Sequence, residues 1–174
     1  KRGSNTPHGS ANFNWADDSL QSSNLPPELE GDSRLQGNDK ADHVDNLTDY
    51  SLDIGGPIWK DHLWGYFSYG KNQIDIIRLV QSPDKTTLEN ITAKVNWQAT
   101  DSDAVSYFFF HPSKVKIGRP TGVEGTIDSD EHLRDQGNAW PAQPHGFHKF
   151  EWNRIWGPNI ISNLKFARFN TGFT

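Results

Sequence analysis

The sequence predicts an all-β fold, an antiparallel segment of about seven strands from a transmembrane β-barrel. Apolar and polar residues alternate with a period of two, which is the pattern of a strand with one dry and one wet face. Long and short connections alternate along the chain, as in outer-membrane barrels. Aromatic residues reach 12% although hydrophobic residues are only 33% and mean hydropathy is -0.77. Alternating membrane strands produce such a composition, because their polar residues offset the apolar ones.

The clearest strand covers 90–99, where apolar residues occupy every odd position and polar residues every even one. The same alternation predicts the first two strands, and the others are rich in aromatic and β-branched residues. No segment predicts a helix. The seven predicted strands cover 9–15, 50–54, 62–71, 90–99, 104–111, 147–156 and 160–169.

The connections between these strands differ in length in a regular way. The first, from Asp17 to Asn46, has about 30 residues, and the next five have about 5, 13, 4, 29 and 3. In outer-membrane barrels the long loops lie outside the cell and the short turns lie in the periplasm. A soluble β-sandwich can carry long loops, but nothing requires them at every second connection.

Charged residues give a test of the barrel, because Arg or Lys on the lipid face costs roughly 2–4 kcal/mol at the bilayer midplane. Charged residues at the alternate positions that also carry the apolar residues are therefore expected near strand ends. Mid-strand charged residues at the other alternate positions are predicted to face the lumen. The first group is Lys71, Glu89, Arg154 and Arg168. The second group is Lys94, Lys149, Glu151 and Lys165.

Tryptophans cluster where strands meet predicted turns, at Trp59, Trp64, Trp97 and Trp156. This placement resembles the aromatic girdle at a membrane interface. The alternative is that Trp and Phe fill the core of a β-sandwich.

Composition excludes several classes of function. The chain has no cysteine, which excludes disulfides, thiolate metal sites and thiol nucleophiles. A net charge of -5 and a pI near 5.7 exclude a polybasic nucleic-acid binder. No apolar stretch approaches the ~18 residues of a membrane helix.

Residues 52–66 read Leu-Asp-Ile-Gly-Gly-Pro-Ile-Trp-Lys-Asp-His-Leu-Trp-Gly-Tyr. This stretch resembles the second barrel turn of TonB-dependent outer-membrane receptors, where a descending strand, a tight periplasmic turn and an ascending strand follow one another. Glycine permits a bend, proline removes a donor where pairing ends, and a Lys-Asp pair suits a wet turn tip. The motif residues are Gly55, Gly56, Pro57, Lys60 and Asp61.

Further upstream, Lys1 to Asn5 and His8 to Ala11 resemble the junction between the plug of that family and its first barrel strand. The subgroup that the sequence resembles has an amino-terminal carboxypeptidase-regulatory-like domain. The resemblance covers about the first third of the chain. From Thr86 onwards it rests only on the alternation of strands with long and short connections.

The resemblance implies high-affinity uptake of a scarce nutrient across the outer membrane of a Gram-negative bacterium. The TonB system would drive it through a plug expected upstream, outer-membrane lipid would surround the barrel, and the ligand would be a siderophore, cobalamin, glycan, peptide or metal chelate. Plugged transporters use about 22 strands. Seven strands leave unpaired edges that lipid cannot satisfy, so we expect residues 1–174 to be a partial barrel domain within a larger polypeptide.

Three residues are candidate ligand contacts. Trp140, in the loop 136–141, can stack on a ligand or pack within its own loop. His111 and His145, with His148, suggest a metal site, but the spacing of 145 and 148 places them on opposite faces of a strand and favours ordinary rim residues. No metal and no cofactor are expected.

No catalytic function is predicted. Acidic runs at 39–45 and 128–131 lack the spacing of an EF-hand, and no hydrolase, phosphate-loop or nucleotide motif is present. The main alternative to the receptor is a secreted carbohydrate-binding β-sandwich that would use Trp140, Trp152 and Asp-rich loops. A further alternative is a barrel without transport function, such as an adhesin scaffold.

Overall fold

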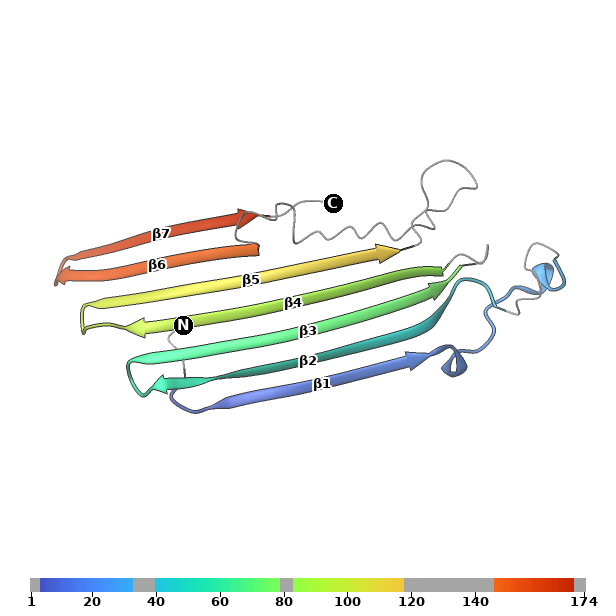
Figure 1. Cartoon of the computed structure of the whole chain (residues 1–174), viewed down its shortest axis with the longest axis horizontal. Helices are drawn as coiled ribbons and strands as arrows, with labels where there is room; N and C mark the ends of the chain where they lie inside the picture. The colour runs from blue at the N-terminus through green and yellow to red at the C-terminus, as the bar shows by residue number, and fades with distance from the viewer. Residues whose placement is uncertain (1–3, 33–39, 79–82, 118–145, 171–174) are drawn as a thin grey trace.

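The computed structural model describes residues 4–32, 40–78, 83–117 and 146–170. These residues form one antiparallel sheet in which each strand pairs with its neighbours in sequence (Figure 1). The predicted all-β antiparallel fold is therefore confirmed. Two 3-10 helices, Asp18–Leu20 and Pro27–Leu29, follow the first strand. The strands are β1 (His8–Asp17), β2 (His43–Trp59), β3 (Leu63–Ile77), β4 (Pro83–Gln98), β5 (Asp103–Ile117), β6 (Gly146–Gly157) and β7 (Ile160–Asn170).

The strands run further toward the long-loop end than the sequence patterns predicted. β3 continues to Ile77 and β4 begins at Pro83, so the predicted third connection of about 13 residues is wrong. Alternation persists through Ile74 and Ile76, and each finds a partner on a neighbouring strand. The two long connections follow β1 and β5 at one end of the sheet, and the turns after β2, β4 and β6 lie at the other (Figure 1).

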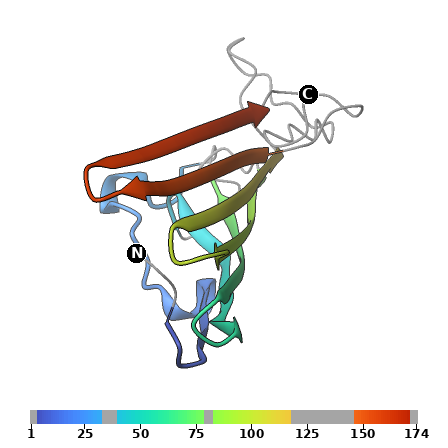
Figure 2. The ribbon, with the colours of Figure 1, turned by 90° about the vertical axis from the view of Figure 1, so that its left-hand side faces the viewer.

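Pairing register divides the side chains between two faces, because successive residues of a strand point to opposite sides. One register row joins Gly65, Val95, Tyr107, Phe150 and Phe166 across β3 to β7, and we call its side the apolar face. The adjacent row joins Tyr66, Lys94, Phe108, Lys149 and Ala167 on the polar face. Figure 2 shows that the sheet is strongly bent, with β6 and β7 turned relative to β2 and β3.

This sheet has almost no hydrophobic core. Among the described residues Trp64 is the one buried hydrophobic side chain, at 7% exposure, whereas Phe13 is 68% and Phe166 65% exposed. A soluble domain normally buries a sheet face against a second layer. The described strands form a single sheet, so they do not by themselves build the two-sheet core of the sandwich alternative. Within the described ranges, no helix is long and apolar enough to cross a membrane.

Trp64 is buried because the segment before β1 lies against the turn that joins β2 and β3. The Trp64 indole N–H donates to Asn5 Oδ1 at 2.8 Å, and the Asp61 backbone N–H donates to the same oxygen at 3.3 Å. Asn5 Nδ2 in turn donates to the Asp61 carboxylate at 2.5 Å. Asp61 adopts a φ of 65°, which an Asp tolerates in a tight turn. One amide thereby links the start of the chain to the turn.

The structure confirms part of the predicted turn motif and corrects the rest. Lys60 and Asp61 are exposed at the turn tip, as expected. Pro57 does not mark the end of pairing, because it lies opposite Trp64 and the ladder continues through a bulge to Trp59. The bulge lies at Ile58, directly after Pro57, and pairing resumes between Trp59 and Leu63.

Gly55 and Gly56 lie inside β2, where they leave room for the amino-terminal segment and do not form the turn. A Cβ on Gly56 would lie 2.8 Å from Pro7 Cα, and a Cβ on Gly55 would lie 2.9 Å from His8 Nε2. These distances are shorter than van der Waals contact. Glycine is therefore required at Gly56, where the near atoms belong to the Pro7 backbone, whereas at Gly55 the near atoms belong to side chains that can move.

We expect Gly56→Ala to lower the free energy of unfolding by about 1–3 kcal/mol, because the methyl group collides with backbone atoms of Pro7. Gly157→Ala is the matched control, since nothing lies within 4 Å of its added Cβ. Its effect should stay within about 0.5 kcal/mol. Urea unfolding in detergent measures both, and equal stability of the two variants would contradict the packing role of Gly56.

Candidate functional site

The apolar side chains of the apolar face form a band that ends at a definite residue on every strand. Counted from the short-turn end, the continuous apolar run on this face ends on β1 to β7 at Trp15, Tyr50, Tyr69, Ile91, Phe109, Phe150 and Phe166. The next residues on the same face are Asp17, Thr48, Lys71, Glu89, His111, His148 and Arg168. The continuous run is thus interrupted by a polar residue on every strand, and apolar residues return further out at Ile77 on β3 and at Val115 and Ile117 on β5.

This edge crosses the sheet obliquely. Trp15 pairs with Thr48, whereas the edge residue of β2 is Tyr50, two positions nearer the short-turn end. From β2 to β7 the edge moves by a further two, zero, two, two and zero residues in the same direction. Together with the first shift of two, the edge moves eight residues over the six strand pairs. At ~3.3 Å per residue and ~4.8 Å between strands, the band makes an angle of about 42° with the perpendicular to the strands.

Two charged residues at this edge lie in mid-strand, which corrects the expectation that they lie near strand ends. Lys71 and Glu89 are register partners joined by an ion pair of 2.8 Å, and the Tyr69 hydroxyl donates to Glu89 at 3.2 Å. Their strands run further than predicted, yet both residues lie just beyond the apolar band. Arg154 and Arg168 do lie within a few residues of the ends of β6 and β7, as expected.

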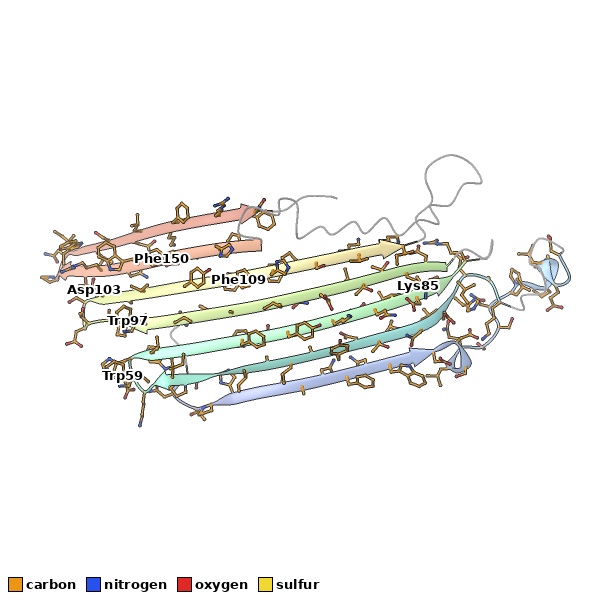
Figure 3. All side chains as sticks on the ribbon, in the orientation of Figure 1. Trp59, Lys85, Trp97, Asp103, Phe109 and Phe150 are labelled. Atoms are coloured by element: carbon orange, nitrogen blue, oxygen red, sulfur yellow. The ribbon has the colours of Figure 1, made fainter. Side chains whose placement is uncertain are left out.

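The short-turn edge of the band carries tryptophans. Trp59, Trp97 and Trp156 are exposed, and Figure 3 places the labelled Trp59 and Trp97 at the end opposite Lys85. The Trp156 indole N–H donates to Ser162 Oγ at 2.9 Å, and Arg154 lies over its ring at 4.3 Å. Trp64 does not belong to this girdle, because its register places it on the polar face under Asn5.

His111 lies on the apolar face at the long-loop edge, within a group of aromatic rings. Its ring stacks on Phe109 at 6.3 Å, and Phe109 also contacts His148 at 5.0 Å. His148 Nδ1 shares a hydrogen bond of 2.7 Å with the Tyr107 hydroxyl. Across the described ranges, no group of three or more His, Cys, Asp or Glu side chains could hold a metal ion. His145 and Trp140 lie outside the described residues.

The polar face carries the mid-strand charges, as their parity predicted. Glu151 lies 3.0 Å from Lys149 Nζ and 3.8 Å from Lys165 Nζ, and it accepts from Asn163 Nδ2 at 3.1 Å. Lys94 lies on the same face, beside a hollow of about 320 Å³ that Glu151 also lines. Each of these charges thus has polar neighbours away from the apolar band.

A second hollow of about 350 Å³ lies on the polar face over β2, β3 and β4. Sequence reasoning missed both hollows, because each strand contributes only two or three polar side chains. The polar parity positions of neighbouring strands are the signal, but it becomes readable only when register is known. The polar side chains of this second hollow are Asp49, Ser51, Asp53, Ser68, Asn72 and Asn90.

An ion cluster ties the strands together beyond the apolar band, at the long-loop end. Asp84 is 2% exposed and accepts from Arg78 Nη2 at 2.5 Å, while Lys116 Nζ lies 2.8 Å from its other oxygen. Burial opposes ionisation of this carboxyl, but hydrogen bonds from Lys116 and Arg78 outweigh it and hold the pKa of Asp84 below its ordinary value. The cluster fastens β4 to β5 and to the end of β3.

We expect Asp84→Asn to lower the free energy of unfolding by about 1.5–3 kcal/mol at neutral pH, because it removes charge-assisted hydrogen bonds. The folded-state pKa is depressed, so the contribution is complete above the ordinary carboxyl pKa of 3.8 and is lost as the pH falls through the folded value. Unfolding measured from pH 7 to pH 2 should show the wild type approaching the variant. A difference that stays constant with pH would contradict the assignment.

Comparison with known proteins gives no further identification. No protein-family model, no curated protein and no solved structure matches this chain. Its function is therefore argued from the two faces of the sheet, the oblique apolar band and the hollows of the polar face.

Proposed function

We propose that this sheet is part of the wall of an outer-membrane β-barrel, with the apolar face toward lipid and the polar face toward the lumen. The observation that carries the proposal is the oblique band. Strands of membrane barrels tilt by about 35–45° from the barrel axis. A band level with the membrane must then cross the strands at the same angle, and the band on this sheet crosses them at about 42°.

Three further features support this setting. All seven strands have between 10 and 17 residues, which meets the ~9–11 that a tilted membrane strand needs. Aromatic side chains lie at both edges of the band, where amphipathic rings favour the interface. On the apolar face, Lys71, Glu89 and Arg168 lie beyond the long-loop edge of the band, and Arg154 lies at the short-turn edge beside Trp156, where a charge costs less than at the midplane.

We further propose that the wall belongs to a TonB-dependent receptor that takes up a scarce nutrient. The turn motif at 52–66 supports this family, and so do the two long connections at one end of the sheet, which would carry ligand-capturing loops. The sheet would supply barrel wall and lumen-facing groups. Energy would come from the TonB system through a plug, and other strands would complete the barrel.

Cell fractionation tests the membrane setting directly. We expect the protein that carries this sequence to remain in the outer-membrane fraction after washing with salt and to leave it only with detergent. Its detergent-extracted mass should be several times the 19.7 kDa of this chain. A soluble monomer of that mass without detergent would contradict the proposal and favour the sugar-binding alternative.

Val95→Arg tests which face meets lipid. Val95 lies inside the band and is 38% exposed. In water such a substitution changes stability by no more than about 0.5 kcal/mol, but in lipid it costs roughly 2–4 kcal/mol near the midplane. Asn96→Arg is the matched control on the polar face. The folded fraction in the outer membrane, measured by heat-modifiable migration, should fall for Val95→Arg alone, and equal fractions would contradict a lipid-facing apolar face.

A further inference from the structure

The polar face offers a binding groove that the receptor proposal does not by itself assign. The hollow of about 350 Å³ over β2, β3 and β4 lies within the ~300–1,000 Å³ range of small-molecule sites. Asp49, Ser51 and Asp53 line it from β2, and Ser68 and Asn72 line it from β3. Its lining combines these polar groups with apolar surface from residues such as Leu88, so the ligand it fits must both form hydrogen bonds and present apolar surface.

Charge disfavours an anionic ligand in this groove. The polar-face positions of β1, β2 and β3 carry Asp49 and Asp53 and include no lysine or arginine. Lys71, which also lines the hollow, occupies an apolar-face position and forms an ion pair of 2.8 Å with Glu89. The potential at the groove is therefore negative, which repels phosphates and carboxylates. The lysines of the polar face lie on β4 and beyond, toward the other hollow.

The arrangement of the carboxylates does not favour a compact cation either. The two aspartates lie four residues apart on one strand, about 13 Å at ~3.3 Å per residue, so one ammonium group cannot contact both. Each carboxylate already accepts from a neutral donor. Asn14 Nδ2 donates to Asp49 at 3.3 Å, and the Ser10 hydroxyl donates to Asp53.

The remaining groups suit hydroxyls. Ser51, Ser68 and the amides of Asn72 and Asn90 each donate and accept hydrogen bonds, as a sugar hydroxyl does. Asn72 Oδ1 is buried without a hydrogen-bond partner among the described residues, although such an acceptor is normally paired. Tyr66, which is 37% exposed at the same groove, offers an aromatic ring for the apolar side of a sugar.

We propose that this groove binds a neutral polyhydroxylated ligand, an oligosaccharide. The inference rests on the proposed function, which places the polar face toward the lumen. The groove would then be a site that the substrate occupies as it passes through the barrel. Polar groups repeat every ~7 Å along each strand and every ~4.8 Å between strands. This spacing lets successive sugar units meet equivalent donors and acceptors.

Isothermal titration calorimetry on the detergent-purified full-length protein tests the groove. The probes are maltohexaose, cellohexaose, xylohexaose and mannohexaose, with spermidine and inorganic phosphate as charged probes. We expect at least one hexaose to bind with a Kd below about 1 mM and neither charged probe to do so. Asn72→Leu and, independently, Tyr66→Ala should each weaken that binding at least tenfold, and Asn96→Leu, outside the groove, should leave it unchanged.

Absence of binding by all four hexaoses would overturn the inference, and so would binding of spermidine alone. Equal weakening by Asn72→Leu and Asn96→Leu would also overturn it, because the groove would then have no special part. These failures are distinct from failure of the receptor proposal, which fractionation decides. If the protein is in the outer membrane but binds no sugar, only the proposed sugar site is refuted. If the protein is water-soluble and binds sugar through Tyr66 and Asn72, only the proposal that the polar face lines a barrel lumen is refuted.

Discussion

An uncovered apolar face is the constraint on which the rest of this structure depends. Seven strands pair edge to edge, and among the described residues Trp64 is the one buried hydrophobic side chain, while many large hydrophobic side chains are exposed. Hydrogen bonds along the ladders hold the strands in register, but they leave the apolar surface in contact with whatever surrounds the sheet. Hydrophobic burial is the main source of folding free energy, so this surface requires a partner that is itself apolar. The lipid bilayer that we propose would meet that requirement.

The oblique course of the band explains several placements that look irregular on single strands. Lys71 and Glu89 lie in mid-strand on the apolar face, but the band has already ended there, and they neutralise each other across β3 and β4. His148 and Arg168 stand at the same edge two strands on. The edge of the band shifts along the strands from one strand to the next. Lys71, Glu89 and Arg168 therefore each lie directly after the end of the apolar run on their own strand.

The polar face is divided in its chemistry. Over β1 to β3 it carries carboxylates, amides and hydroxyls, and from β4 onward it also carries lysines around Glu151. At the short-turn end, Asn5 holds the amino-terminal segment against the turn and buries Trp64. The polar face therefore has three distinct regions, which are a neutral-to-acidic groove, a region with Lys94, Lys149 and Lys165, and the site where the amino-terminal segment covers Trp64. A wall that only separates lipid from water would not need such differences.

The sequence by itself determined the class of the fold, the number of strands and the face on which most side chains lie, because a period of two is a local property of the chain. It therefore located the lysines of the polar face and the wet tip at Lys60 and Asp61. Only the tertiary structure decided where the strands end, that Trp64 is buried, and that Gly55 and Gly56 make room for Pro7 and His8. Register decided the slant of the band and the composition of the groove. These features depend on which residues of different strands stand opposite one another, and alternation within one strand is the same for every even shift of register.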